Sequence, residues 1–236
     1  MKLAIGIGKN KNILKAIEIF KNKYTIETIL IENDADLSKA ILSPDINAVV
    51  RGSLPASGVM KEIKKHHSEI ARATFIHGDN KYFLLTPVGI DEGKTIDEKF
   101  KIAQHCSEFL QKLGKNPKIA ILANGRKGDY GRSKEISKSI DESEKLTKLL
   151  KEKTNYNVEN YYILIEQAIK DKCNVIIAPD GIVGNIIFRT LVLVNSWPSC
   201  GAVTFGIDGV YIDTSRDQTT EGYLRSLILA YNLANL

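Results

Sequence analysis

Apolar and polar positions follow two different periods along this chain. Short runs of apolar, often β-branched residues have the length of buried strands. Several are followed by the three- and four-residue spacing of an amphipathic helix, which favours an α/β protein, either one large domain or two that share a cleft. The predicted strands cover 2–7, 25–31, 46–50, 82–86, 118–123, 174–178, 200–205 and 210–213. The predicted helices cover 13–20, 59–65, 96–113, a charged stretch ending near 154, 158–170, the run after 185, and 220–233.

The stretch from Cys173 to Val194 combines a strand, a glycine-containing loop and an apolar helix. In α/β proteins such loops present backbone N–H groups to ligands at the carboxyl ends of strands. Gly181 and Gly184 permit close backbone approach, while Asp180 and Asn185 add polar groups. The pattern predicts a ligand-binding loop, and an ordinary strand-to-helix turn with a helix cap is the alternative.

A second strand, loop and helix follow one another between residues 46 and 65. Its loop and expected helix start contain Arg51, Gly52, Ser53 and Ser57. The helix dipole and side-chain donors would together stabilise an oxyanion there. Helix capping alone would explain the serines but not the arginine, so we expect these residues to contact a ligand.

A third loop, NGRKGDYGRS, follows the strand predicted at 118–123 and holds three glycines and three cations. We expect Arg126 and Lys127 in this loop to close over a phosphate group. A solvated flexible loop is the alternative. The loop lacks the GK[ST] of a Walker motif, and Gly6-Ile7-Gly8 lacks the third glycine of a dinucleotide fingerprint, so neither nucleotide site is predicted.

Composition narrows the classes of function. The 236 residues are 43% hydrophobic and 26% charged, as in soluble globular proteins, and the net charge of +5 includes no dense basic run. A small anionic ligand is therefore favoured over nucleic acid as a partner. The three cysteines are far apart and the four histidines have no metal-ligand spacing, so neither disulfides nor a metal site is predicted. No signal peptide or membrane span is predicted, which favours a cytoplasmic protein.

Four segments resemble, in order, the phosphate acetyl- and butyryltransferases and the phosphate acyltransferase of lipid synthesis. VVRGSLPASGVMKEIKK is similar to their early small-residue loop and helix, and PKIAILANGRKGDYG to the strand and loop that open their second lobe. NVIIAPDGIVGNIIFRT resembles their strand, G-x-x-GN loop and helix. GAVTFGIDGVYIDTSRDQTTEGYLRSLIL resembles their terminal segment with its Ser-Arg pair, here Ser215 and Arg216. Within this superfamily the chain is identified as a member of the methyltransferase subunit X family, also called methanogenesis marker protein 4.

The resemblance implies a phosphotransacetylase-like fold, related to that of isocitrate and isopropylmalate dehydrogenases. Two α/β lobes with mainly parallel sheets, residues 1–93 with 205–236 and residues 94–204, would enclose a ligand cleft. Relatives bind coenzyme A and an acyl phosphate there and often dimerise, so coenzyme A or another phosphate-bearing ligand and a homodimer are expected. Ser215 and Arg216 would be catalytic, with Arg216 pairing with phosphate or developing negative charge.

One position departs from the acyltransferases, which carry an aspartate, thought to be the general base, seven positions after the serine. This chain has Gly222 there, and Glu221 beside it is rotated by about 100° on a helix. The family name implies a transferase in a methyl-transfer complex of methanogen one-carbon metabolism, with other subunits as partners. The fold alone implies acyl transfer, and a non-catalytic ligand-binding or regulatory subunit is the further alternative.

The final helix, 220–233, carries Leu224, Leu227, Ile228 and Tyr231 on one face. Because the resemblance returns the end of the chain to the first lobe, we expect this helix to pack on the N-terminal segment.

Overall fold

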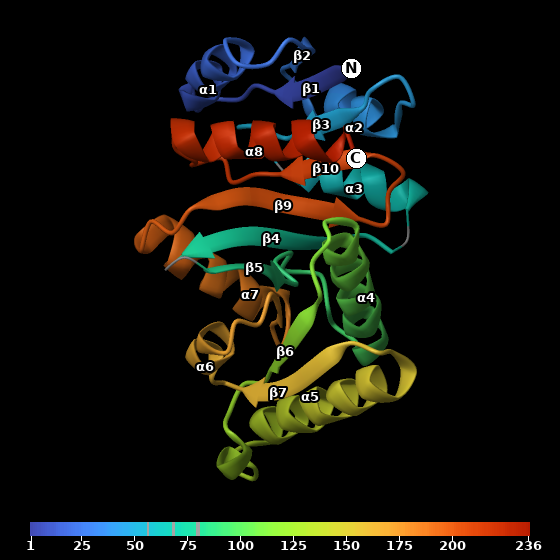
Figure 1. The fold of residues 1–236 in the computed structure, drawn as a ribbon, viewed down its shortest axis with the longest axis vertical. Coiled ribbons are helices and arrows are strands. Elements are labelled where there is room, and N and C mark those ends of the chain that lie inside the picture. Colours follow the sequence, from blue (N-terminus) through green and yellow to red (C-terminus); the bar gives the residue numbers. More distant parts are fainter. Residues whose placement is uncertain (56, 68, 79–80) are drawn as a thin grey trace. The chain divides into compact units, whose positions relative to one another are not determined.

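The computed structural model describes residues 1–55, 57–67, 69–78 and 81–236 (Figure 1). Two compact units make up the described chain, the first formed by Met1–Arg72 and Pro198–Leu236 and the second by Ala73–Trp197. Each unit combines helices with a mainly parallel sheet, which confirms the predicted fold class. The lobe boundaries implied by the resemblance, and the cleft between the lobes, remain predictions.

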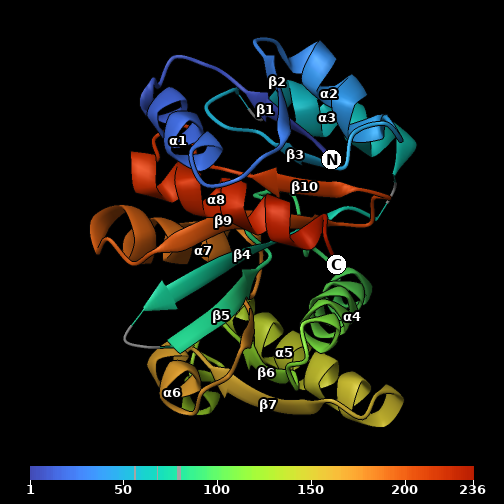
Figure 2. The ribbon, with the colours of Figure 1, turned by 45° about the horizontal axis from the view of Figure 1, so that its top comes forward.

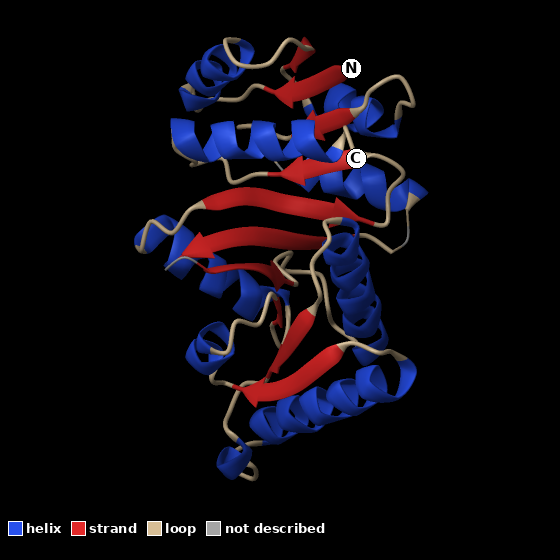
Figure 3. Cartoon of the chain, viewed as in Figure 1, coloured by secondary structure: helices blue, strands red, loops and turns tan. Residues whose placement is uncertain are grey.

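The sheet of the first unit has the strand order β2-β1-β3-β10-β9 (Figure 3). Neighbouring strands in this order are parallel except β9, which runs antiparallel to β10. Strands covered on both faces tolerate continuous apolar runs, and Leu3, Ala4 and Ile5 of β1 are all fully buried. The strands are β1 (Lys2–Gly6), β2 (Glu27–Ile31), β3 (Ala48–Val50), β9 (Ser199–Phe205) and β10 (Val210–Asp213).

Helix α8 joins the end of the chain to its beginning, as predicted. It packs on α1 and on β3, β9 and β10 (Figure 2). Its buried face is not the predicted stripe, because Leu224, Ile228 and Tyr231 are only partly buried. The fully buried positions include small side chains, Ser226 and Ala230, which allow a close approach to the sheet. The helices of this unit are α1 (Asn12–Lys21), α2 (Asp34–Leu42), α3 (Ser57–His66) and α8 (Thr220–Leu233).

The sheet of the second unit has the strand order β4-β5-β8-β6-β7. β4 and β5 form an antiparallel pair, and the remaining pairs are parallel. The strands are β4 (Ala71–Gly78, which begins at the boundary), β5 (Lys81–Thr86), β6 (Lys118–Leu122), β7 (Asn157–Tyr162) and β8 (Val175–Ile177). The helices are α4 (Ile96–Lys112), the short η1 (Lys127–Asp129), α5 (Lys134–Lys153), α6 (Ile165–Lys170), α7 (Gly181–Phe188) and the π-helical η2 (Arg189–Val194).

The helix predicted over 158–170 is wrong in its first half. Residues Asn157–Tyr162 form β7, which pairs in parallel with β6, and α6 occupies only Ile165–Lys170. The sequence of this segment, NVENYY, has no clear helical or strand period, and pairing with the edge of β6 decides in favour of a strand. Strand β4 and helix α2 were not predicted. None of the described helices is long and apolar enough to span a membrane.

Candidate functional site

Three loops of the first unit leave the same edge of its sheet. β1, β3 and β10 are adjacent and parallel, so their carboxyl ends lie together. We call the residues that follow these ends, Gly6–Gly8, Arg51–Leu54 and Asp213–Gln218, the strand-end site. Of the predicted site residues, the structure brings together here Arg51, Gly52, Ser53, Ser215 and Arg216.

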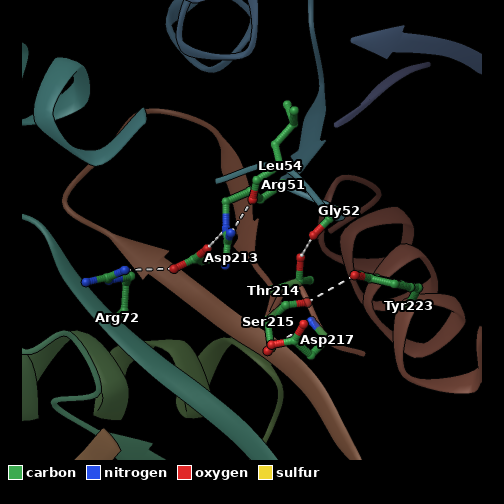
Figure 4. Close-up of polar contacts among 9 residues, drawn as sticks. All are labelled: Arg51, Gly52, Leu54, Arg72, Asp213, Thr214, Ser215, Asp217 and Tyr223. Atoms are coloured by element: carbon green, nitrogen blue, oxygen red, sulfur yellow. Dashed lines mark hydrogen bonds and ion pairs between the residues drawn. The ribbon is translucent and has the colours of Figure 1, made fainter. Parts of the chain in front are cut away.

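Hydrogen bonds join the three loops directly. The backbone N–H of Gly8 donates to Oγ of Ser53 at 2.7 Å, and the N–H of Ser53 donates to the carbonyl of Gly6 at 3.3 Å. Oγ1 of Thr214 donates to the carbonyl of Gly52 at 2.6 Å (Figure 4). Each loop is therefore held in shape by another that is distant in sequence.

The glycines of these loops allow their backbones to touch. Gly52 has φ +61°, and a Cβ on it would lie 1.9 Å from the carbonyl oxygen of Gly6. A Cβ on Gly6 would in turn lie 2.1 Å from the carbonyl oxygen of Arg51. The Gly6-Ile7-Gly8 segment thus serves close loop packing.

Arg51 belongs to a buried ionic cluster with Asp213 and Arg72 (Figure 4). Nε of Arg51 donates to one carboxylate oxygen of Asp213, and Nη1 of Arg72 donates to the other at 2.7 Å. Nη1 of Arg51 also donates to the carbonyl of Leu54. Arg51 is 6% exposed and Asp213 is 8% exposed. Much of the hydrogen-bonding capacity of Arg51, which was predicted to serve a ligand, is therefore taken up by contacts within the protein.

The cluster stays ionised at neutral pH. Burial by itself would raise the pKa of the Asp213 carboxyl, but the positive charges of Arg51 and Arg72 outweigh burial and hold this pKa below its ordinary value. Burial likewise opposes the charge of Arg51, and the Asp213 carboxylate more than compensates, so the pKa of Arg51 is raised. Each partner thus keeps the other charged.

Hydrogen bonds hold the backbone of the loop with Ser215 and Arg216, while the Arg216 side chain is exposed. Nδ2 of Asn10 donates to the carbonyls of Arg216 at 2.9 Å and Gln218 at 3.0 Å. The hydroxyl of Tyr223 donates to the carbonyls of Ser215 at 3.2 Å and Arg216 at 2.9 Å. Burial raises the pKa of Tyr223 to about 12, so this hydroxyl remains a donor at neutral pH. The Arg216 side chain is exposed, and no described residue bonds or pairs with its guanidinium.

At position 222, where the resemblance implies a general base, the neutral side chain of Gln218 fills the space beside the glycine. Gly222 is buried, and a Cβ on it would lie 2.3 Å from Oε1 of Gln218. Gln218 is itself buried. Glu221 and Asp217 are both exposed. An aspartate at position 222 would therefore require the Gln218 side chain to move.

In the second unit, the predicted residues of the β8–α7 loop fix the start of α7. Oδ1 of Asp180 accepts the N–H groups of Ile182 and Val183, both at 2.9 Å. Nδ2 of Asn185 donates to the carbonyl of Val88 at 3.0 Å.

The two glycines of this loop pack against the backbone that follows β5. A Cβ on Gly181 would lie 1.6 Å from the carbonyl oxygen of Gly89, and one on Gly184 would lie 1.9 Å from that of Pro87. These contacts explain why glycine and capping residues occur here. Ligand binding by Asp180, Gly181, Gly184 and Asn185 remains a prediction.

The other predicted contacts have less defined surroundings. Arg126 and Lys127 are exposed on the loop after β6, whose turn is fixed by Asp129 through the N–H of Arg126 and an ion pair with Arg132 at 3.2 Å. Ser57 begins α3, and its side chain lies outside the described part of the structure. Their roles also remain predictions.

Several residues that shape the strand-end site were not predicted from the sequence: Asn10, Arg72, Asp213, Gln218 and Tyr223. Asp213 offered one signal, since it is a charged residue ending a predicted buried strand. Arg72 offered none, because its partner lies 141 residues away. Within the described ranges, no cluster of three or more His, Cys, Asp or Glu side chains could hold a metal ion.

Comparison with known proteins places this chain among methyltransferase-named relatives. It is 39% identical over 233 residues to "Uncharacterized methyltransferase" of Methanocaldococcus jannaschii, which covers 95% of this chain and 94% of that protein. It is 37% identical over 203 residues to "Putative methyltransferase mtx subunit X" of Methanosarcina mazei, covering 85% and 71% of the two chains. No family model matches the chain.

Solved structures show the fold. A branched-chain phosphotransacylase from Enterococcus faecalis has a TM-score of 0.78 at 18% identity and covers 99% of both chains. A 4-hydroxythreonine-4-phosphate dehydrogenase from Klebsiella pneumoniae has a TM-score of 0.62 at 10% identity and covers 98% of this chain and 90% of that one. These likenesses confirm the predicted phosphotransacetylase- and dehydrogenase-like fold. By its identity to these relatives, the chain belongs to the methyltransferase mtx subunit X family.

Proposed function

We propose that the strand-end site binds the oxyanion of a small phosphate-bearing ligand, with Arg216 as its main contact. The observation that carries this proposal is an exposed guanidinium without a described partner, on a loop held by Asn10 and Tyr223. A guanidinium can make two parallel hydrogen bonds to a phosphate, and a loop already held loses little freedom on binding. The half-buried Ser215 adds a hydroxyl beside it.

The buried residues of the site have a supporting role in this proposal. Arg51 is paired with Asp213, while Gly52 and Ser53 join the loops through their own hydrogen bonds. They set the position of the Asp213–Gln218 segment, and Arg216 supplies the charge that the ligand meets.

The proposed activity is group transfer, as a subunit of a methyltransferase complex in methanogen one-carbon metabolism. Support comes from the names of the relatives that are 39% and 37% identical, a methyltransferase and a methyltransferase subunit. Coenzyme A or another phosphate-bearing molecule is the proposed ligand. Other subunits of the complex would then be partners of this chain.

Acyl transfer is the second candidate, favoured by the likeness to a phosphotransacylase. A positioned base that takes the proton of a thiol contributes about 10²–10⁴-fold to rate. Near Ser215, position 222 is a glycine against a neutral carboxamide, and Asp217 and Glu221 are exposed. We therefore expect slow or absent acyl transfer in the isolated protein, and the same observation supports a non-catalytic binding subunit.

Calorimetry with inorganic phosphate, acetyl phosphate and coenzyme A tests the binding proposal. Because a hydrogen bond to a charged group contributes about 1.5–3 kcal/mol, Arg216→Ala should weaken binding at least about tenfold. Lys15→Ala is the matched control, since it removes an exposed positive charge from α1 in the same unit. Equal affinities of the wild type and Arg216→Ala would contradict the proposal.

An assay of acyl-coenzyme A formation from acetyl or butyryl phosphate separates the activities. Turnover of about 1–10³ per second by the isolated protein would show acyl transfer as its function and contradict a binding-only role. Binding without turnover would favour action within a complex. Methyl transfer is then tested with partner subunits that co-purify with the chain.

A homodimer is proposed from exposed apolar side chains on one face of α7. Ile182 is 57% exposed and Ile186 is 60% exposed, at the four-residue spacing that places both on one side of the helix. A second copy covering this face would bury both. Light scattering should then show a dimer for the wild type and a monomer for Ile186→Lys, and a monomeric wild type would contradict the proposal.

A further inference from the structure

Gln218 holds an unsatisfied polar group inside the strand-end site. The residue is 5% exposed, and its Nε2 has no hydrogen-bond partner in the described structure. Buried polar side chains nearly always have a partner, so an exception beside a ligand loop asks for an explanation. Gln218 lies two positions after Arg216, on the same held segment.

The unpaired atom belongs to the carboxamide at the end of the Gln218 side chain. The backbone of Gln218, in contrast, is well held. Its carbonyl accepts from Nδ2 of Asn10 at 3.0 Å and from Nδ2 of Asn12 at 3.3 Å. The unsatisfied part is thus confined to a side chain on a fixed backbone.

Space for the carboxamide exists because residue 222 has no side chain. A Cβ on Gly222 would lie 2.3 Å from Oε1 and 3.0 Å from Cδ of Gln218. An apolar side chain at position 218 would fill this space without an unpaired donor. A polar residue that lowers stability next to Ser215 and Arg216 is the pattern expected where function and stability compete.

We propose that Gln218 is a further ligand-binding residue, whose carboxamide turns away from Gly222 so that its NH₂ donates to an oxygen of the bound oxyanion. Rotation about its side-chain bonds is enough to reorient the carboxamide, and the anchored backbone keeps the group within two residues of Arg216. A carboxamide is neutral and takes no proton at neutral pH, so its contribution is recognition of an acceptor oxygen. This inference rests on the proposed function, because it assigns a second donor to the same oxyanion.

The test compares Gln218→Met with the wild type in ligand affinity and in thermal stability. Met has a similar length and makes no strong hydrogen bond. Affinity for inorganic phosphate or acetyl phosphate should fall about tenfold, as expected for one lost hydrogen bond to a charged group. The Tm should rise by about 2–4 °C, because the buried unpaired donor is gone. A structural role alone would not lower affinity while raising Tm.

Thr204→Val is the matched control. Thr204 on β9 is 4% exposed, and its Oγ1 also lacks a partner in the described structure. Its replacement should raise Tm and leave ligand affinity unchanged. If Arg216→Ala weakens binding but Gln218→Met does not, the role of Gln218 is overturned and the proposed function stands. If the wild type binds none of the phosphate ligands, both fall.

Discussion

Two arginines of the first unit, both in motifs that predict oxyanion binding, have opposite surroundings. Arg51 is 6% exposed and bound to Asp213 and to the carbonyl of Leu54, whereas Arg216 is exposed and has no partner among the described residues. A buried guanidinium needs a counter-charge, and once paired it has few donors left for a ligand. Burial and pairing therefore separate the arginine that supports the site from the one that can bind at it.

The largest effect is expected from removing the counter-charge of the ionic cluster. Asp213→Ala leaves the buried Arg51 without its carboxylate and takes a partner from Arg72, so it should lower the free energy of unfolding by about 3–5 kcal/mol. Urea unfolding measures this. The exposed Asp217→Ala is the control and should change stability by less than about 0.5 kcal/mol. A small effect of Asp213→Ala would show that the cluster does not support the fold.

Acid should produce a smaller version of the same loss. The Asp213 pKa is lowered from its ordinary value of 3.8 by Arg51 and Arg72 against the effect of burial, so the unfolded chain binds this proton first as pH falls. Its stabilising contribution is therefore complete above about pH 5 and is lost as pH falls below about 4. Unfolding measured against pH should show a flatter acid decline for Asp213→Asn. Identical slopes would refute the assignment.

Lysine substitutions should distinguish the structural role of Arg51 from the ligand-binding role of Arg216. Lysine lacks the planar fork that serves Asp213 and the Leu54 carbonyl together, so Arg51→Lys should cost about 1.5–3 kcal/mol of stability. Arg216→Lys should leave stability within about 0.5 kcal/mol and weaken phosphate binding instead. Thermal unfolding and calorimetry on the same two proteins decide the matter. The comparison fails if both variants lose stability equally.

The smallest effect is expected from the bonds that hold the Arg216 loop. Tyr223→Phe removes a hydroxyl that donates to the carbonyls of Ser215 and Arg216, which should cost about 1 kcal/mol. Hydrogen exchange of the amides at 215–217 should become faster. Tyr231→Phe is the control, since its ring contacts Phe20 edge-on and Tyr24 at a tilt, and its hydroxyl bonds to none of the described residues. Unchanged exchange in Tyr223→Phe would indicate that other contacts hold the loop.

Part of this fold and site followed from local sequence. The strand at 210–213 and the helix at 220–233 were predicted with the bounds that the structure shows, because a short β-branched and aromatic run and a capped periodic segment each favour one conformation. Arg216 was also singled out. The segment 157–162 was assigned wrongly, since its strand forms by pairing with β6.

The sequence by itself determined most of the order of strands and helices and some of the polar residues at the loop starts, among them Arg51 and Arg216. Apolar period and glycine placement are local properties, so they can be recognised without a structure. Only the tertiary structure decided that Arg51, and not Arg216, is paired with a carboxylate. Arg51 and Asp213 are 162 residues apart in the sequence. Likewise, the reason for a glycine at position 222 is visible only in the structure, where the carboxamide of Gln218 fills the space that a side chain would occupy. Charge pairing and excluded volume act between neighbours in space, and parallel strand order makes these residues neighbours.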